Sequence, residues 1–470
     1  MAHGRVNPRA LTADLDQNTE PEQGHGRRRH RQARNGNQVA AQALAQDDSG
    51  AEDFWSSGQG DVQLASAEGN GDNGLQTAPT EVAPEANVAD TGKTESAGGK
   101  TDREKPAGGD GAPTTPSVEG ATPTSGRYIV FVKKATLVDG ATRKPNGSTL
   151  EYGTAVDALE ELTVDKAKWV HIKAVEGGTE GWVRSRNIRQ VSTQLDAAAI
   201  DEAALKKASD AAVAAAPADL ATQAASTIPV ILKQAAMLGE KNGNRVAYML
   251  ATAQHESRMG DVMVEKRNGF RYAKKTKKYT STVHTNGEAV VADSEDELET
   301  KYWDSAYGGK LGNEAGTTDA RNYRGRGYVQ ITGRESYKKM SAVLNAQGFS
   351  YSADGQTWGG QGNPKIDLVA NYTHVNTVPE LAARLLVEGS KQGHYTQKAL
   401  SSYIKDDEED PDFYNARSVI NGDKAKIEPG QTESNGQRIA DIAKTYAAAI
   451  TPLWSAVFKA AGDAEKPKAE

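Results

Sequence analysis

The sequence predicts a multidomain protein with a low-complexity N-terminal tail, a small all-β barrel and a mainly α-helical C-terminal domain. Residues 1–125 are rich in small and polar residues and have almost no aromatic ones. Residues 126–192 contain short β-branched and aromatic runs separated by turn-rich pieces, which predict strands. Over residues 227–462, apolar residues recur at helical spacing. The Ala-rich stretch 193–226 favours helix, so we expect a helical linker there.

The N-terminal tail carries 11 Lys and Arg against 19 Asp and Glu. It cannot bury enough apolar surface to offset chain entropy, so we expect it to be disordered. The exception in charge is the basic cluster GRRRHRQAR, whose cations fall within residues 27–34. This cluster is either a solvated run or a docking segment for a partner or an anionic surface.

Composition excludes several classes of function. The chain has no cysteine, and therefore no disulfide, thiolate zinc site or thiol nucleophile. Its net charge of −7 argues against a protein that binds polyanions over its whole surface. The first 24 residues lack the apolar core of a signal peptide, and no run approaches the ~18 apolar residues of a membrane span. We therefore expect a soluble protein.

In the β-rich region, Val170, Ile172 and Ala174 alternate with polar neighbours, as in a half-buried strand. The region ends with Gly-Trp-Val at 181–183. Over residues 127–191 this pattern resembles a bacterial Src-homology-3-like domain. The resemblance implies a barrel that either binds cell-wall peptide or glycan, or acts as a structural spacer, with Trp169 and Trp182 in its core.

The C-terminal domain contains one carboxylate in an unusual position. The stretch NRVAYMLATAQHESRMG predicts a helix ending near Gly260, and Glu256 lies in its last turn close to the apolar face. Partial burial and the negative end of the helix dipole both raise the pKa of a carboxyl there. Glu256 is thus either a proton donor or a surface residue paired with Arg258 or Lys266.

Four motifs follow one another in this domain: AQHESRMG, YRGRGYVQITGRESY, NPKIDLVANY and SVINGDKAKI…QRIADIAKTY. Together they resemble glycoside hydrolase family 19, which includes chitinases and phage or bacterial endolysins of lysozyme-like fold. The resemblance implies that Glu256 is the general acid. It also implies a substrate-binding cleft. The residues that would line this cleft or support the acids are Tyr323, Arg324, Gln330, Thr332, Asn421 and Arg438.

An inverting glycosidase needs a second carboxylate to activate water. In the family this acid precedes the GRG turn, but here Gly308 stands at that position. Some endolysins place an acid nine residues after the first, which here is Glu265. Glu265 can pair with Glu256 only if the helix ends near Gly260 and the chain folds back, because nine helical residues rise ~13.5 Å. Asp304, Glu314 or no second base are the alternatives.

Other site types find no support in the motifs. His255 has no partner at zinc-ligand spacing, no phosphate loop is present, and Ser lacks a nucleophile context. We therefore expect no metal or organic cofactor and no nucleic acid partner for Arg324 and Arg326.

The resemblance implies a peptidoglycan hydrolase that cleaves β-1,4 glycosidic bonds with inversion. A chitinase, a lytic transglycosylase and a non-catalytic wall-binding component of a phage or contractile injection particle are the alternatives. Without a signal peptide, we expect the protein to reach the wall through a holin, through lysis or on a particle that docks the tail.

Overall fold

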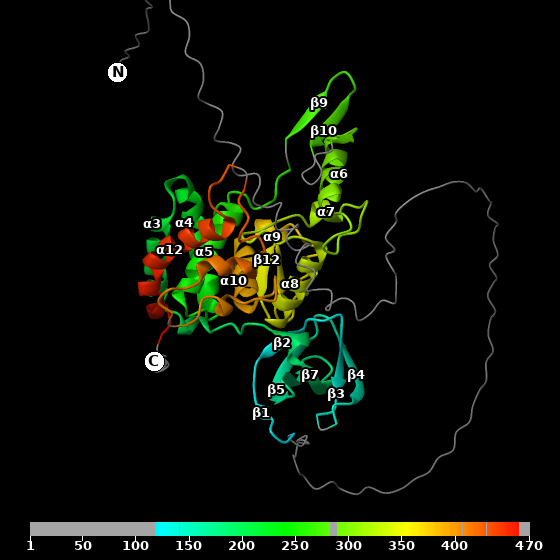
Figure 1. Ribbon diagram of the computed structural model, residues 1–470, viewed down its shortest axis with the longest axis vertical. Coiled ribbons are helices and arrows are strands. Elements are labelled where there is room, and N and C mark those ends of the chain that lie inside the picture. Colours follow the sequence, from blue (N-terminus) through cyan, green and yellow to red (C-terminus); the bar gives the residue numbers. More distant parts are fainter. Residues whose placement is uncertain are drawn as a thin grey trace, which may run out of the picture.

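The computed structural model describes residues 118–140, 142–267, 269–282, 289–406, 408–428 and 430–459. Most of the N-terminal tail, including its basic cluster, lies outside the described residues, so its expected disorder stays a prediction. Within the described ranges, no helix is both long enough and apolar enough to span a bilayer. The described chain is a mixed α/β structure in which a β-sheet region precedes a larger helical region (Figure 1).

The first region is an eight-stranded antiparallel sheet with strand order β4-β3-β7-β6-β5-β2-β8, in which β1 pairs with β5. Its core holds Ile172 and Val170, as the alternating pattern predicted. Trp182 is buried and stacks on His171 at 5.1 Å, whereas Trp169 is half-buried under the guanidinium of Arg184. The likeness to a Src-homology-3 domain stays a prediction. The strands are β1 (Thr122–Pro123), β2 (Arg127–Val130), β3 (Lys134–Val138), β4 (Pro145–Glu151), β5 (Ala155–Val164), β6 (Ala167–Ala174), β7 (Glu180–Arg184) and β8 (Ile188–Gln190).

The second region contains the helices and two small sheets. The helices are α3 (Glu202–Ala215), α4 (Ala221–Met237), α5 (Gly243–Ser257), α6 (Glu295–Tyr307), α7 (Asp319–Asn322), α8 (Arg334–Ala346), α9 (His374–Thr377), α10 (Pro379–Gln392), α11 (Phe413–Ala416) and α12 (Asn435–Trp454). One sheet has the order β11-β10-β9 and the other pairs β12 with β13. These strands are β9 (Phe270–Ala273), β10 (Lys278–Thr282), β11 (Ala289–Ala292), β12 (Ser350–Ala353) and β13 (Gln356–Gly359).

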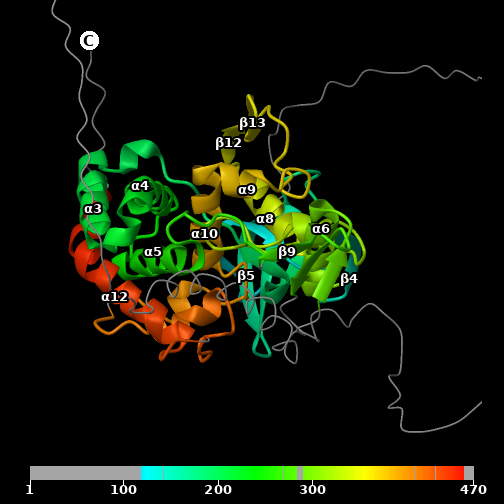
Figure 2. The ribbon, with the colours of Figure 1, turned by 90° about the horizontal axis from the view of Figure 1, so that it is seen from above.

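Helix α5 is the centre of the helical core. Val246, Met249, Leu250 and Ala253, whose spacing predicted the helix, are all fully buried. Seen from above, α3, α4, α5 and α12 lie together on one side, with α10 between them and α6 (Figure 2). Helix α5 is therefore held on several sides, which fixes the position of its last turn.

The Ala-rich segment that was expected as a linker also belongs to this core. Helix α3 starts at the cap Asp201, whose side chain accepts from Ala204 N, and ends at Ala215, before Pro217. Its Leu205, Ala208 and Ala212 are buried in the same cluster as α5. The segment thus supports the helix that carries Glu256.

The sheet region and the helical region share contacts. Ile129 and Phe131 are buried in the helical core cluster. Arg127 donates to the carbonyl of Ala346 at 3.3 Å, and the backbone N–H of Ser192 donates to Glu388 at 3.1 Å. The β region is therefore packed against α8 and α10 (Figure 1).

Candidate active site

A sharp turn follows α5 and sets the geometry of the site. The helix ends at Ser257, three residues before the expected glycine stop, because Arg258, Met259 and Gly260 all adopt left-handed backbone angles with φ of 51°, 55° and 89°. The hydroxyl of Thr227 donates to the carbonyl of Met259 at 2.8 Å and holds the turn. The chain reverses here, so Glu265 lies on a loop rather than on a continued helix.

The loop is attached to the GRG segment. Val264 forms a β-bridge with Arg326, which also bridges to Ile331. Gly325 exchanges two hydrogen bonds with Glu265: the Glu265 N–H donates to Gly325 O at 2.8 Å, and the Gly325 N–H donates to Glu265 Oε2 at 3.1 Å. A Cβ at Gly325 would come within 2.8 Å of Gln330 Oε1 and 3.3 Å of Glu265 Oε2, so a larger residue there would push on both side chains.

Glu256 is nearly buried and is paired with an arginine. Its Oε1 accepts from Arg417 Nη1 at 2.5 Å, and Arg417 Nε also donates to Asp423 at 2.6 Å. Burial raises the pKa of Glu256, while Arg417 lowers it and the charge of Asp423 raises it further. Because Arg417 is divided between two carboxylates, its charge compensates only part of the cost of ionising Glu256.

Glu265 is buried in a different environment. Its Oε1 accepts a hydrogen bond from the hydroxyl of Tyr307 at 2.8 Å, so both oxygens have donors. Burial raises the pKa of Glu265 to about 7; the hydrogen bonds and Arg324 oppose this, and the charge of Glu256 adds to it. The two carboxyls therefore interact electrostatically across the site.

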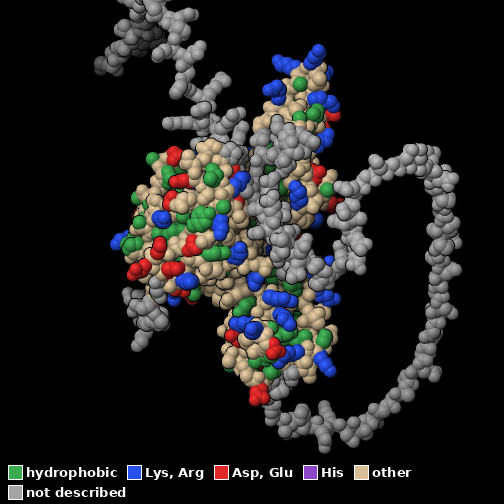
Figure 3. Space-filling view, viewed as in Figure 1, with side chains coloured by type: hydrophobic (Ala, Val, Ile, Leu, Met, Phe, Trp, Pro, Cys, Tyr) green, Lys and Arg blue, Asp and Glu red, His purple; other side chains and the backbone are tan. Residues whose placement is uncertain are grey.

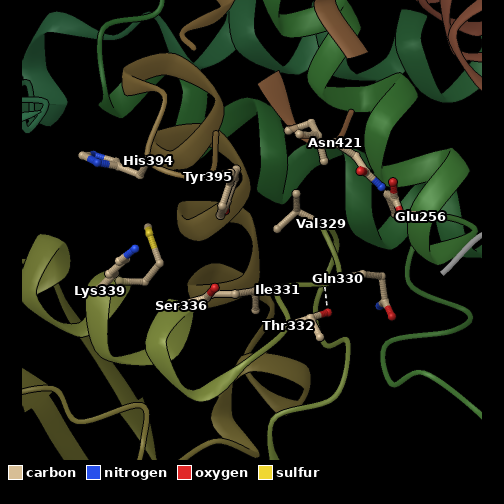
Figure 4. A pocket seen from close by; sticks show the side chains of 12 residues that line it. Glu256, Val329, Gln330, Ile331, Thr332, Ser336, Lys339, His394, Tyr395 and Asn421 are labelled. Carbon is tan, nitrogen blue, oxygen red and sulfur yellow. Dashed lines mark hydrogen bonds between the residues drawn. The ribbon is translucent and has the colours of Figure 1, made fainter. Parts of the chain in front are cut away.

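A pocket extends from Glu256 along segment 329–332, which leaves the turn after Arg326 and does not form the expected strand (Figure 4). Glu256 and Asn421 lie at one end, and His394 and Lys339 lie at the other. The lining residues are Glu256, Val329, Gln330, Ile331, Thr332, Ser336, Lys339, Met340, His394, Tyr395, Ile420 and Asn421. A chain-like ligand could thus lie along the segment 329–332 with one of its bonds at Glu256.

Asn421 is the polar side chain best placed to receive a ligand. It is 1% exposed, and neither its amide nitrogen nor its amide oxygen has a hydrogen-bond partner among the described residues. Unpaired buried polar atoms cost stability, so a side chain of this kind in a pocket indicates a binding role.

The remaining predicted residues divide into pocket residues and supports. Gln330 and Thr332 line the pocket, and Gln330 holds a left-handed backbone angle (φ 54°) while its amide donates to Gly327 O at 2.8 Å. Arg324 donates to the carbonyl of Glu265 at 3.1 Å. Tyr323 instead packs in the core, where its hydroxyl donates to the carbonyl of Val369 at 3.1 Å.

Arg438 is half-buried on α12 and acts electrostatically on His255, so its expected role as a support of the acids stays a prediction. Burial lowers the pKa of His255 to about 3, with Arg417 and Arg438 adding to the effect. Sequence reasoning missed Arg417, the arginine that contacts Glu256, as well as Asp423 and Tyr307. Asp423 lies two residues after Asn421 in the VINGD motif, which could have drawn attention to it.

Neither of the alternative acids, Asp304 and Glu314, is among the residues that line the pocket. Asp304 accepts from the backbone of Gly316 at 2.9 Å, and Glu314 is exposed. A Cβ at Gly308 would lie 2.1 Å from Asp304 Oδ1, so an acid at that position would require this turn to change. Among the described residues, no cluster of His, Asp and Glu is arranged to hold a metal ion.

Comparisons with known proteins identify no family. No family model matches the chain, and no curated protein matches it. A solved structure of chitinase C from Streptomyces griseus HUT6037 aligns with 13% identity and a TM-score of 0.26, covering 64% of this chain and 93% of its own. A mutant of chitinase C aligns with 14% identity and a TM-score of 0.23, covering 63% and 90%. These scores are too low to assign a fold family.

Proposed function

We propose that this protein is a glycoside hydrolase that cleaves the β-1,4-linked glycan of peptidoglycan with inversion of configuration. The observation that carries the proposal is a pair of buried carboxyls: Glu256, which lines the pocket, and Glu265, whose pKa is raised in part by the charge of Glu256. Acid–base hydrolysis of a glycosidic bond needs one protonated and one ionised carboxyl. Burial raises the pKa of both carboxyls, and we assign the acid role to Glu256 because it is the one that lines the pocket.

In this mechanism Glu256 donates its proton to the glycosidic oxygen. Glu256 lines the pocket, and its burial favours the protonated form. As it ionises, Arg417 stabilises the carboxylate through the short hydrogen bond to Oε1. Glu265 accepts a proton from water and thereby activates it, while Tyr307 and Gly325 fix its orientation. Asn421 binds a sugar substituent through its unpaired amide.

The second candidate is a lytic transglycosylase, whose product is a 1,6-anhydro sugar and whose mechanism needs only one carboxylate. One observation favours it: both oxygens of Glu265 already accept hydrogen bonds, and Glu265 is not among the residues that line the pocket. Under this candidate Glu265 supports the site rather than activating water.

The proposal also assigns roles to the β-sheet region and to the N-terminal tail. The Src-homology-3-like pattern over 127–191 supports a wall-binding role for the sheet region. Its packing against α8 and α10 would hold a bound wall polymer near the pocket. We propose that the protein acts on the wall after lysis, through a holin, or on a particle that engages the N-terminal tail.

The test is digestion of purified peptidoglycan and of chitin, with mass analysis of the products. The wild type should release reducing ends from peptidoglycan, and Glu256→Gln should lose at least 10²-fold of this activity because the proton donor is removed. The matched control is Glu240→Gln, since Glu240 is another buried glutamate paired with an arginine, Arg245.

Each outcome separates the candidates. Reducing ends of inverted configuration support the hydrolase, and 1,6-anhydro ends identify the transglycosylase. Faster release from chitin would identify a chitinase. Full activity of Glu256→Gln would contradict all three mechanisms.

A further inference from the structure

The three-stranded sheet β9–β11 presents a cationic turn to solvent. Lys274, Lys275 and Lys277 occupy the turn between β9 and β10, and all three are exposed. The strands project beyond the helical body (Figure 1), and Lys and Arg side chains gather at their far end (Figure 3). We call β9, β10 and this turn the basic hairpin.

The charge of this turn is not neutralised by the described residues. No ion pair within the described part of the chain involves Lys274, Lys275 or Lys277, whereas Lys278 at the start of β10 pairs with Asp293. The chain as a whole carries a net charge of −7, so this is a local reversal of charge. A concentrated cationic turn attracts a polymer that carries negative groups.

Aromatic side chains lie directly behind the lysines. Tyr272 and Tyr279 are cross-strand partners with ring centroids 4.8 Å apart, and Phe270 follows at 5.6 Å from Tyr279. Tyr272 is 46% exposed and Phe270 is 40% exposed. These rings offer flat apolar surface, against which the C–H faces of sugar rings can pack.

The distribution of the apolar residues argues against a bilayer as the partner. Val291 is also exposed, but its register opposite Thr280 places it on the other face of the sheet from Tyr272. The exposed apolar side chains are thus divided between two faces. A surface that lies in a membrane interface needs one continuous apolar face.

The basic hairpin is connected to the candidate active site through helix α6. Strand β9 begins five residues after Glu265. Arg267, between them, pairs with Glu295 and Glu299 of α6. The last residue of α6 is Tyr307, which donates to Glu265. The basic hairpin and Glu265 are therefore both held by helix α6.

We infer that the basic hairpin is a second binding site for substrate, which takes the carboxylates of a peptide-bearing wall glycan while the sugar chain occupies the pocket. The inference rests on the proposed function and refines its substrate class, because it selects an acidic glycan over a neutral one. Lys274, Lys275 and Lys277 would pair with the carboxylates, and the aromatic face would contact the sugars. Neutral chitin would gain only the aromatic contacts.

The test measures binding separately from cleavage. In the Glu256→Gln background, the triple variant Lys274→Gln, Lys275→Gln and Lys277→Gln is sedimented with peptidoglycan sacculi and with chitin. The matched control replaces three exposed lysines of α3 and α4, Lys206, Lys207 and Lys233, by Gln, which gives the same change in net charge.

The hairpin variant should bind sacculi about tenfold more weakly than the control and lose the sensitivity of binding to NaCl, because exposed charge pairs are screened by salt. Binding to chitin should be the same in both variants. Equal binding of the two variants to sacculi would overturn the inference, and so would tighter binding of the parent protein to phosphatidylglycerol vesicles than to sacculi. The absence of sugar release by the wild type would instead contradict the proposed function, so the two failures are distinguishable.

Discussion

Arg417 and Glu256 form a hydrogen bond of 2.5 Å between Nη1 and Oε1, and neither side chain has more than 4% of its surface exposed. The same guanidinium donates to Asp423 through Nε at 2.6 Å and through Nη2 at 3.2 Å. Asn435, at the start of α12, donates to Asp423 at 2.9 Å. The protonation of Glu256 therefore depends on a charged group that serves two carboxylates.

The first prediction concerns Asp423. Asp423→Asn removes a negative charge that raises the pKa of Glu256, so the pKa of Glu256 should fall. A proton donor with a lower pKa loses its proton at lower pH, and the alkaline limb of kcat/KM should move to lower pH. Asp441→Asn, on the exposed face of α12, is the control. If the alkaline limb does not move in Asp423→Asn, the charge of Asp423 does not influence the pKa of Glu256.

The second prediction concerns the acidic limb of the same profile. A general base works when it is ionised, and the pKa of Glu265 is raised to about 7 by burial. Activity should therefore increase with pH through a limb near pH 7, and Glu265→Gln should lower kcat by about 10²-fold or more. A limb near pH 7 through which activity falls would show that Glu265 is the proton donor instead.

The third prediction concerns Tyr307, whose hydrogen bond lowers the pKa of Glu265. Tyr307→Phe removes the donor at 2.8 Å, so the pKa of Glu265 should rise and the acidic limb should move to higher pH. Tyr351→Phe loses a similar bond, to His374 at 2.9 Å, outside the site, and should leave the limb in place. If both variants shift the limb equally, the effect is not specific to Glu265.

The fourth prediction concerns stability. The pKa of Glu265 is about 7 in the folded chain against an ordinary value of 4.5, so the folded state binds the proton more tightly. The stability this provides is fully present below pH 4.5 and is lost as pH rises through 7, a change on the order of 3 kcal/mol. In urea unfolding between pH 4.5 and 8, the loss should be smaller by about this amount in Glu265→Gln than in the wild type, because Glu256 adds a loss of the same sign in both proteins. The exposed Glu380→Gln should behave as the wild type.

The fifth prediction concerns Asn421. Its amide has no partner among the described residues, so Asn421→Leu removes no hydrogen bond from that part of the fold. Stability should stay within about 1 kcal/mol of the wild type or increase. Activity should fall by at least tenfold, because the substrate loses a polar contact. Loss of both stability and activity would indicate a structural role for this side chain.

The sequence indicated the elements through local rules. The spacing of Val246, Met249, Leu250 and Ala253 predicted α5, because one face of a helix must be apolar to be buried. The alternation of Val170, Ile172 and Ala174 with polar residues predicted a strand, because every second side chain of a strand lies on the same face and that face must be apolar to be buried. Gly260 was correctly associated with a chain reversal, although the helix ends earlier because Arg258 and Met259 also adopt left-handed angles.

By itself, the sequence determined that Glu256 lies in the last turn of a buried helix and that Glu265 can approach it only after a reversal. Only the tertiary structure decided which groups surround the two acids. Arg417 is 161 residues from Glu256 in the chain, and Tyr307 is 42 residues from Glu265. The pKa of a buried carboxyl depends on charges and donors within a few ångströms, and such neighbours are set by packing rather than by distance along the chain.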